Sequence, residues 1–487
     1  MRFCKVKKKL GSCMLAIFAG SGLAACVAVG PDYQTPSVDV PSAWSRSDPG
    51  ANAERTVSAP TDMARWWREL NDPVLEALVA DALAANLDLA TARAQLREAR
   101  ARRALAGAQL GPSVDVSASA SRSQSSEETG GGNSRELYSA GFDAGWEADV
   151  FGGLRRGVEA AEADVEASVE SLRDTQVSLV AEVVLNYVDL RTAERRLAVT
   201  EANIAALEEI RQLAQWRLQA GLVSQLDVAQ ARTEVESAGA GLPALRTAMV
   251  EARNRLAVLL GSAPGALMNR LAATGVIPLA ERSAALGIPA DMLRRRPDVR
   301  AAERRLAAQT ARLGEAQSER YPRFNLSGSI GLEAFALSAL GNSGASVYSL
   351  LASITAPIFD SGRIKANIAT QDALLEQALL GYKSAVLTAL EDVENALAAL
   401  ADADERRQRL EQAAESARET LQLAEQRYAG GLTDFLTVLD SRRTLLNLEN
   451  DLASSSGQLS GAQIQLYKAL GGGWSPNSQP EDTRNAS

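Results

Sequence analysis

The chain has 487 residues, with 51 Lys and Arg, 60 Asp and Glu, no His and three Cys, and its formal net charge is −9. The lack of histidine removes the commonest general base and the commonest zinc ligand. The three cysteines are Cys4, Cys13 and Cys26, so the body of the chain cannot hold a disulfide framework or a thiolate metal cluster. The acidic balance argues against a nucleic-acid binder. We therefore expect no enzyme, no metal site and no nucleic-acid partner.

The start of the chain, 1–25, has the pattern of an export signal. Arg2 and four lysines precede an apolar stretch, Leu10 to Leu23, that is short for a membrane span of about 20 apolar residues. The stretch ends in Leu23-Ala24-Ala25-Cys26, which resembles a bacterial lipobox whose cysteine is diacylated and becomes the mature N-terminus. The alternative is a plain secretory signal with an incidental cysteine. Val27 stands where an inner-membrane retention signal has Asp, which favours the outer membrane.

The body of the chain is an internal repeat. Matching segments are separated by a constant offset in sequence, which we call the repeat distance, for example Pro112 to Ser117 with Pro322 to Ser327, and Gly221-Leu222 with Gly431-Leu432. A stable soluble pseudo-dimer would show the same repeat. We predict a signal peptide at 1–25, a lipidated extended segment at 26–61, a first repeat at 62–261, a connector at 262–289, a second repeat at 290–471 and a disordered tail at 472–487.

Each repeat contains a predicted β-hairpin, at 113–150 and at 322–359. Within 137–150 apolar and polar residues alternate, with Phe142 and Trp146 on one face and Asp143 and Glu147 on the other. Segments of about 10 residues with this alternation suit membrane-spanning strands, although a soluble sheet packed on helices also alternates. Four strands cannot close a barrel and an open edge cannot face lipid. Three copies would supply twelve strands.

After each hairpin we predict a helix of about 65 residues, roughly 100 Å long at 1.5 Å per residue. Apolar residues recur at spacings of three, four and seven, which indicates partner helices along its length. Each helix ends at a glycine turn, Gly221-Leu222 or Gly431-Leu432, and Ser224 and Asp434 are candidate N-caps of the returning helices. In the first repeat, Gly239 to Pro243 predicts a break in the returning helix.

Taken together, these features resemble the TolC-like outer membrane factor family, in particular its branch of outer membrane lipoproteins from tripartite efflux systems. The resemblance covers nearly the whole mature chain. It rests on the following motifs, in this order: Gly30-Pro31-Asp32-Tyr33, Trp66-Trp67, Asp72-Pro73, Asn86-Leu87-Asp88, the stretch from Leu293 to Glu303, and the two Gly-Leu turns.

This resemblance implies a mainly α-helical fold with membrane β-strands. Long α-helical hairpins would form a coiled-coil tunnel, and four strands per protomer would complete a 12-stranded trimeric β-barrel. It implies a homotrimer in the outer membrane that extends into the periplasm, with N-palmitoyl and S-diacylglycerol groups on Cys26 and no other cofactor. It also implies a periplasmic adaptor protein and an inner-membrane pump, of the resistance-nodulation-division type, as partners.

The resemblance also places functional residues at the turns. Gly221, Leu222, Gly431 and Leu432 match tips that contact the adaptor, while plain turn geometry explains the glycines equally well. A periplasmic gate is expected from Asp440, Thr437, Asp227 and Tyr428, of which Thr437 stands where some members have a second Asp. The alternative for these four is a solvated helix face. Three Asp440 carboxylates around a three-fold axis would attract cations.

We predict a passive exit duct for small molecules, gated at its periplasmic tip and without a catalytic centre. A duct for type I protein secretion and a non-conducting periplasmic coiled-coil lipoprotein are the alternatives. The stretch from Arg294 to Arg300 is basic and would start a helix with Pro297 in its first turn; its role stays open. The sequence does not name the exported compounds, the pump or the resting state of the pore.

Overall fold

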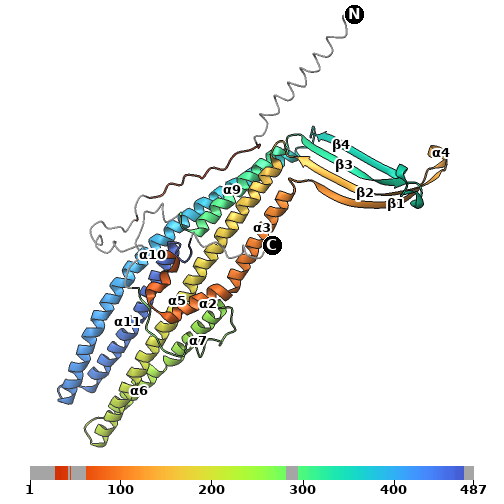
Figure 1. Ribbon diagram of the computed structural model, residues 1–487. Coiled ribbons are helices and arrows are strands. Elements are labelled where there is room, and N and C mark those ends of the chain that lie inside the picture. The colour runs from red at the N-terminus through yellow and green to blue at the C-terminus, as the bar shows by residue number, and fades with distance from the viewer. Residues whose placement is uncertain (1–27, 42–43, 45–61, 281–293, 476–487) are drawn as a thin grey trace, which may run out of the picture. The chain divides into compact units, whose positions relative to one another are not determined.

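The computed structural model describes residues 28–41, 44, 62–280 and 294–475 (Figure 1). The predicted signal peptide, Cys26 and most of segment 26–61 lie outside these residues, as do residues 281–293 and residues 476–487 of the predicted tail. Among the helices that are described, none is both long and apolar enough to cross a membrane.

The described chain is mainly helical, as the sequence predicts, with one sheet of four strands. The elements of the first half are η1 (Met63–Leu70), α2 (Pro73–Ala85), α3 (Leu87–Ala108), β1 (Ser113–Gln124), α4 (Glu127–Gly130), β2 (Ser134–Ala148), α5 (Gly153–Gln219), α6 (Gln225–Gly239) and α7 (Leu242–Leu259). Those of the second half are α9 (Pro297–Ser318), β3 (Arg323–Ala334), η2 (Leu337–Ala339), η3 (Ser343–Ala345), β4 (Ser346–Thr355), α10 (Arg363–Ala429) and α11 (Phe435–Ala469).

The elements of the two halves obey the repeat distance found in the sequence. The helices α5 and α10 have 67 residues each, and both of their ends are separated by this distance. The same holds for α3 with α9 and for β1 with β3. Three pairs of glycines with positive φ follow the same rule, namely Gly152 with Gly362, Gly221 with Gly431, and Gly261 with Gly471. The predicted internal repeat is confirmed.

Two compact units share these elements. Unit 1 comprises Met1–Ser37, Gln95–Val169 and Ala301–Lys383, and unit 2 comprises Val38–Ala94, Glu170–Arg300 and Ser384–Ser487. The helices α3, α5, α9 and α10 therefore contribute residues to both units. Each unit is described by itself below.

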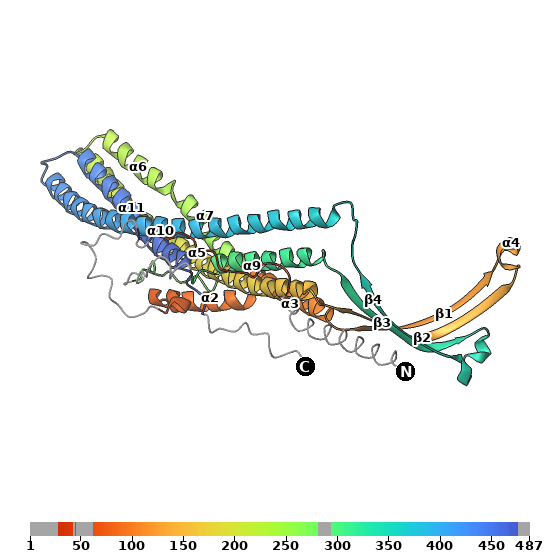
Figure 2. The same ribbon diagram turned by 90° about the horizontal axis from the view of Figure 1, so that it is seen from above.

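Unit 1 contains the sheet, an antiparallel meander in the order β1-β2-β3-β4 (Figures 1 and 2). The strands lie within the predicted hairpins 113–150 and 322–359. The first hairpin loop contains the one-turn helix α4, because the Ser126 hydroxyl caps it by accepting a hydrogen bond from the Glu128 N–H. Polar groups at a cap favour a helical turn that periodicity alone does not reveal.

An extended N-terminal strap also belongs to unit 1. Arg156 on α5 donates to the backbone carbonyls of Val29 and Gly30 and forms an ion pair with Asp32 at 2.7 Å. The Tyr33 hydroxyl donates to Glu303 on α9 at 3.0 Å. Because each contact joins the strap to a helix, the Gly-Pro-Asp-Tyr motif fixes the start of the described chain on unit 1.

Unit 2 has an apolar core with a buried polar network. Residues that are almost fully buried in it are Trp66, Leu75, Leu78, Tyr187, Leu256 and Ile464. The Tyr187 hydroxyl donates to Asp72 at 2.6 Å and accepts from Arg191, which forms an ion pair with Glu194 at 2.6 Å. Buried charges need such partners, since their desolvation is costly.

The returning helices differ between the repeats, as predicted. In the first repeat α6 ends at Gly239 and α7 begins at Leu242, with Pro243 in its first turn. In the second repeat α11 runs without a break for 35 residues. The pair of glycines followed by a proline explains the break, because glycine weakens a helix and proline fits only its first turn.

Candidate functional site

One face of the sheet is a continuous apolar surface. The register places Val116, Phe142, Ile330 and Tyr348 opposite one another across the four strands. All four are more than half exposed, and Tyr348 is 84% exposed. A soluble monomer rarely exposes so large an apolar patch, so this face indicates contact with lipid or with another protein.

The other face of the sheet is polar. In the next row, Asp115 lies opposite Asp143, which in turn lies opposite Ser329. The Ser117 hydroxyl donates to Asp143 at 2.6 Å. Two carboxylates directly opposite each other are unfavourable in a dry environment. This face is therefore suited to water.

The first of the two glycine turns, which connects α5 to α6, is built as predicted. Gly221 has φ of +69° and the Leu222 N–H donates to the Arg217 carbonyl at 2.8 Å, which ends α5. Asp227 accepts hydrogen bonds from both the backbone N–H and the hydroxyl of Ser224, each at 2.7 Å. In this structure Asp227, a predicted gate residue, caps its own helix. Leu222 is 73% exposed at the turn.

The second turn repeats this backbone with other side chains. Gly431 has φ of +73°, and the Leu432 N–H donates to the Arg427 carbonyl at 2.8 Å. Asp434 caps α11 by accepting from the Thr437 N–H at 2.9 Å and from the Thr437 hydroxyl. These hydrogen bonds from Thr437 lower the pKa of Asp434. Thr437, predicted as a gate residue, is thus a partner of the helix cap.

The remaining predicted gate residues lie on α10 and α11, the two helices that the second turn connects. Asp440 forms an exposed ion pair with Arg443 at 2.9 Å, one turn further along α11. The Tyr428 ring lies 5.5 Å from the Phe435 ring and 4.6 Å below the Arg217 guanidinium. The buried Tyr428 hydroxyl has no hydrogen-bond partner within the described part of the chain. One chain thus places Asp440 and Tyr428 near the second turn without joining them to each other.

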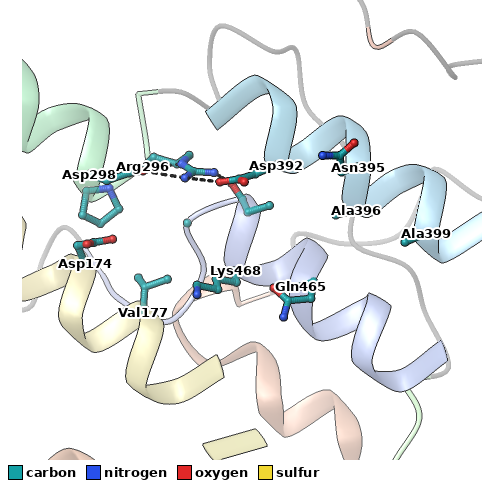
Figure 3. A pocket seen from close by; sticks show the side chains of 13 residues that line it. Asp174, Val177, Arg296, Asp298, Asp392, Asn395, Ala396, Ala399, Gln465 and Lys468 are labelled. Atoms are coloured by element: carbon teal, nitrogen blue, oxygen red, sulfur yellow. Dashed lines mark hydrogen bonds and ion pairs between the residues drawn. The ribbon is translucent and has the colours of Figure 1, made fainter. Parts of the chain in front are cut away.

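Arg296 forms the centre of the basic stretch, and α9 begins at Pro297 as predicted. Its side chain forms ion pairs with Asp298 at 2.7 Å and with Asp392 at 2.9 Å, and donates to the Ala469 carbonyl at 3.0 Å (Figure 3). Burial lowers the pKa of Arg296, but Asp298 and then Asp392 outweigh this effect and the net pKa is raised. Arg296 is therefore a neutralised anchor rather than a free anion site.

A pocket of about 340 Å³ lies beside this anchor. Its lining includes Asp174 and Val177 from α5, Asn395 from α10 and Lys468 from α11 (Figure 3). No group of three or more His, Cys, Asp or Glu side chains in the described ranges is arranged to hold a metal ion.

The sequence reading missed the role of Asn86 and Arg296 as equivalent anchors. The Asn86 amide donates to the Leu259 carbonyl at 2.9 Å, and Arg296 donates to the Ala469 carbonyl at 3.0 Å. The two donors are separated by the repeat distance, and so are the two acceptors. Applying that distance to each polar residue of a helix start would have revealed this pair.

Comparison with known proteins identifies the family. A sequence profile described as "Outer membrane efflux protein" matches residues 78–262 and again residues 288–472. The chain is 33% identical to outer membrane protein OprJ of Pseudomonas aeruginosa, over 94% of this chain and 95% of OprJ. It is 31% identical to the toluene efflux pump outer membrane protein TtgI of Pseudomonas putida, over 95% of this chain and 98% of TtgI.

A solved structure of the outer-membrane channel OprN has the same fold. It superposes with a TM-score of 0.84 at 37% sequence identity, and the match covers 92% of this chain and 99% of that one. The two profile matches are themselves separated by the repeat distance, which agrees with the repeat seen in the helices and strands. The chain belongs to the outer membrane efflux protein family.

Proposed function

We propose that the protein is the exit duct of a tripartite efflux system for small molecules, a passive homotrimeric channel in the outer membrane. The observation that carries this proposal is the sheet, with one exposed apolar face, one polar face and two open edges. Lipid tolerates no open sheet edge. Three copies supply twelve strands, which close into a barrel with the apolar face toward lipid and the polar face toward water.

The long helices α5 and α10 line the periplasmic part of this duct, and their turns face an adaptor protein that links it to an inner-membrane pump. A pump of the resistance-nodulation-division type fits a passive duct, since the pump supplies the energy. The relatives named for efflux support small molecules as cargo over secreted proteins. A strain that lacks the chain should lose tolerance to toxic small molecules. Loss of a secreted protein with unchanged tolerance would contradict this choice.

Single-channel recording in planar lipid bilayers tests the duct itself. The purified trimer should conduct, and Asp440→Ala should increase its open probability, since we assign Asp440, Thr437, Asp227 and Tyr428 to a periplasmic gate. Arg443→Ala is the matched control, because it breaks the same ion pair but keeps the carboxylate. Equal open probabilities of the two variants would reject a role for the Asp440 charge. A folded trimer that never conducts would favour a structural lipoprotein.

The adaptor contact at Gly221, Leu222, Gly431 and Leu432 is tested by side-chain size. Nothing lies within 4 Å of a Cβ built at Gly431, so a larger side chain would point into open space. Gly431→Trp should impair export, whereas Gly431→Asn should retain it, because asparagine tolerates the left-handed backbone of the turn. Equal export by both variants, at equal amounts of folded trimer, would reject the contact.

Anchoring at Cys26 is tested by metabolic labelling with radioactive palmitate. Cys26→Ser should lose the N-palmitoyl and S-diacylglycerol groups and all label. Label retained by the variant would show that another residue carries the lipid.

A further inference from the structure

The pocket beside Arg296 contains polar side chains that the anchor does not use. Its volume is about 340 Å³, and all of its lining residues belong to unit 2. Asn395 from α10 and both Gln465 and Lys468 from α11 line it, and their side chains make no hydrogen bond or ion pair with another described residue. A volume of this size suits a small organic molecule.

Two alanines of α10, Ala396 and Ala399, contribute to the open space of this pocket. Their repeat counterparts on α5 are Asn186 and Asp189, which both have larger side chains. The equivalent helix of the first repeat thus accommodates larger residues at these positions. The fold of the repeat therefore does not require alanine here, and the space is a particular feature of the second repeat.

The first repeat has an ion pair at a position where the second repeat has a neutral side chain. Arg255 on α7 pairs with Glu182 on α5 at 3.2 Å. Their repeat counterparts are Gln465 and Asp392, so the cation is absent from α11 while the carboxylate on α10 remains. Asp392 accepts from Arg296 through Oδ2, whereas Oδ1 has no partner in the described part of the chain. The pocket therefore keeps a carboxylate oxygen that can bind a further cation.

The pocket also contains a cation that the first repeat lacks. Lys468 lies on α11 close to Gln465, and its repeat counterpart on α7 is Val258. Figure 3 shows α10 with Asp392 and Asn395 along one side of the pocket and α11 with Lys468 and Gln465 along another. A negative and a positive group thus line the same pocket from two different helices.

We propose that this pocket binds a small organic zwitterion, whose ammonium group contacts Asp392 on α10 and whose carboxylate contacts Lys468 on α11. The ammonium group takes the part that the Arg255 guanidinium has in the first repeat. A bound zwitterion ties α10 to α11, as the ion pair of Arg255 with Glu182 ties α5 to α7. The site goes beyond the proposed duct, because all of its groups belong to one chain and to one unit.

The rest of the lining suits the middle of such a ligand. Ala396, Ala399 and Val177 offer apolar surface to methylene groups, and the amides of Asn395 and Gln465 can each donate and accept hydrogen bonds. A short amino acid with its charges at opposite ends has this order of groups. A ligand with a single charge would leave either the carboxylate or the ammonium group of the pocket without a partner, which favours the zwitterion.

Isothermal titration calorimetry of the purified protein in detergent tests the site with three probes. The zwitterion 5-aminopentanoate carries both charges, whereas pentanoate lacks the ammonium group and butylamine lacks the carboxylate. At millimolar concentrations 5-aminopentanoate should bind saturably and at least about tenfold more tightly than either analogue, because each analogue forgoes one charge-assisted hydrogen bond. Equal affinities of the three probes, or no saturable binding of 5-aminopentanoate to the folded protein, would overturn the proposal.

Substitutions then assign each contact. Lys468→Met should weaken 5-aminopentanoate binding at least about tenfold and leave butylamine binding unchanged, since butylamine has no carboxylate. Gln465→Arg should weaken the binding of both, because it restores the guanidinium of the first repeat beside Asp392. Ala399→Leu should abolish binding by filling the pocket, whereas Ala401→Leu, at an exposed position outside the lining, should retain it.

The melting temperature of each variant without ligand shows whether it is folded. If folded Lys468→Met or folded Gln465→Arg binds 5-aminopentanoate as tightly as the wild type does, the proposal is overturned. The comparison of the three probes on the wild type decides the matter should these variants fail to fold.

Discussion

The two repeats have the same backbone but stabilise it with different side chains. Both long helices end with a left-handed glycine and the same hydrogen bond of 2.8 Å, at Leu222 and at Leu432. At the first turn an aspartate three residues after the serine closes the cap, and at the second turn the cap residue itself is an aspartate. The two turns therefore share their backbone geometry but differ in which residue carries the charge at the helix cap.

The anchors at the starts of the shorter helices also differ in their side chains, although both anchors are buried. Asn86 and Arg296 hold equivalent carbonyls, but Asn86 is neutral and Arg296 requires two aspartates to balance its charge. One geometric task therefore has a neutral and an ionic solution in one chain. Removing each side chain should lower the free energy of unfolding by a different amount, because breaking a buried ion pair costs more than leaving a carbonyl without its amide donor.

The largest expected effect is therefore at Arg296. Arg296→Ala should lower the free energy of unfolding by about 3–5 kcal/mol, since it leaves two aspartates and a backbone carbonyl without their partner, whereas Asn86→Ala should cost about 1–3 kcal/mol. Thermal unfolding of the purified protein in detergent measures both. Equal losses would show that the charge at the second anchor carries no extra cost.

A glycine pair gives the next largest difference. A Cβ at Gly261 would lie 2.4 Å from the Ala85 carbonyl oxygen, whereas at Gly471 the nearest atom would be 3.3 Å away. Both positions have positive φ, so alanine is strained at each. Gly261→Ala should cost about 2–4 kcal/mol from strain and overlap together, and Gly471→Ala about 1–2 kcal/mol from strain alone. The order of the two melting temperatures checks this, and a reversed order would contradict it.

Much of this arrangement could be predicted from the sequence, because periodicity and turn chemistry are local. The alternation around Phe142, the glycine turns at Gly221 and Gly431, and the break at Gly239 all follow from neighbouring residues. The partners of Arg296 and Tyr187 could not be predicted in this way. Asp392 and Asp72 lie far from them along the chain, and a sequence pattern does not record which buried groups meet after folding.

The two repeats also differ at Tyr187, and this difference should make stability depend on pH. It belongs to a buried network in the first repeat, and its counterpart in the second repeat is Leu397. Burial, followed by the hydrogen bond to Asp72, raises the pKa of Tyr187 from 10.0 to about 12. An unfolded tyrosine then loses its proton before the folded one, so its contribution to stability is complete below pH 10 and is lost between pH 10 and about 12.

Tyr187→Phe should therefore unfold with less alkaline sensitivity than the wild type. The difference should approach about 3 kcal/mol across this pH range, from about 1.4 kcal/mol per pH unit. Tyr321→Phe, at a position 40% exposed and outside the apolar row of the sheet, is the control and should keep the wild-type slope. If both variants behave alike, the buried hydroxyl is not the group that titrates.

The helix caps at the two turns give the smallest expected effect. Ser224→Ala should cost about 1 kcal/mol, because Asp227 loses its hydroxyl donor and the cap is weakened. Asp434→Asn should change how stability depends on pH. Because the pKa of Asp434 is lowered in the folded protein, its contribution to stability is present above the unfolded pKa and is lost as the pH falls through the folded pKa. Hydrogen exchange at Thr437 should thus become less sensitive to acid in Asp434→Asn and stay unchanged in Ser224→Ala. Acid sensitivity that persists in Asp434→Asn would assign it to another carboxylate, and the two turns would then differ in sequence but not in their response to pH.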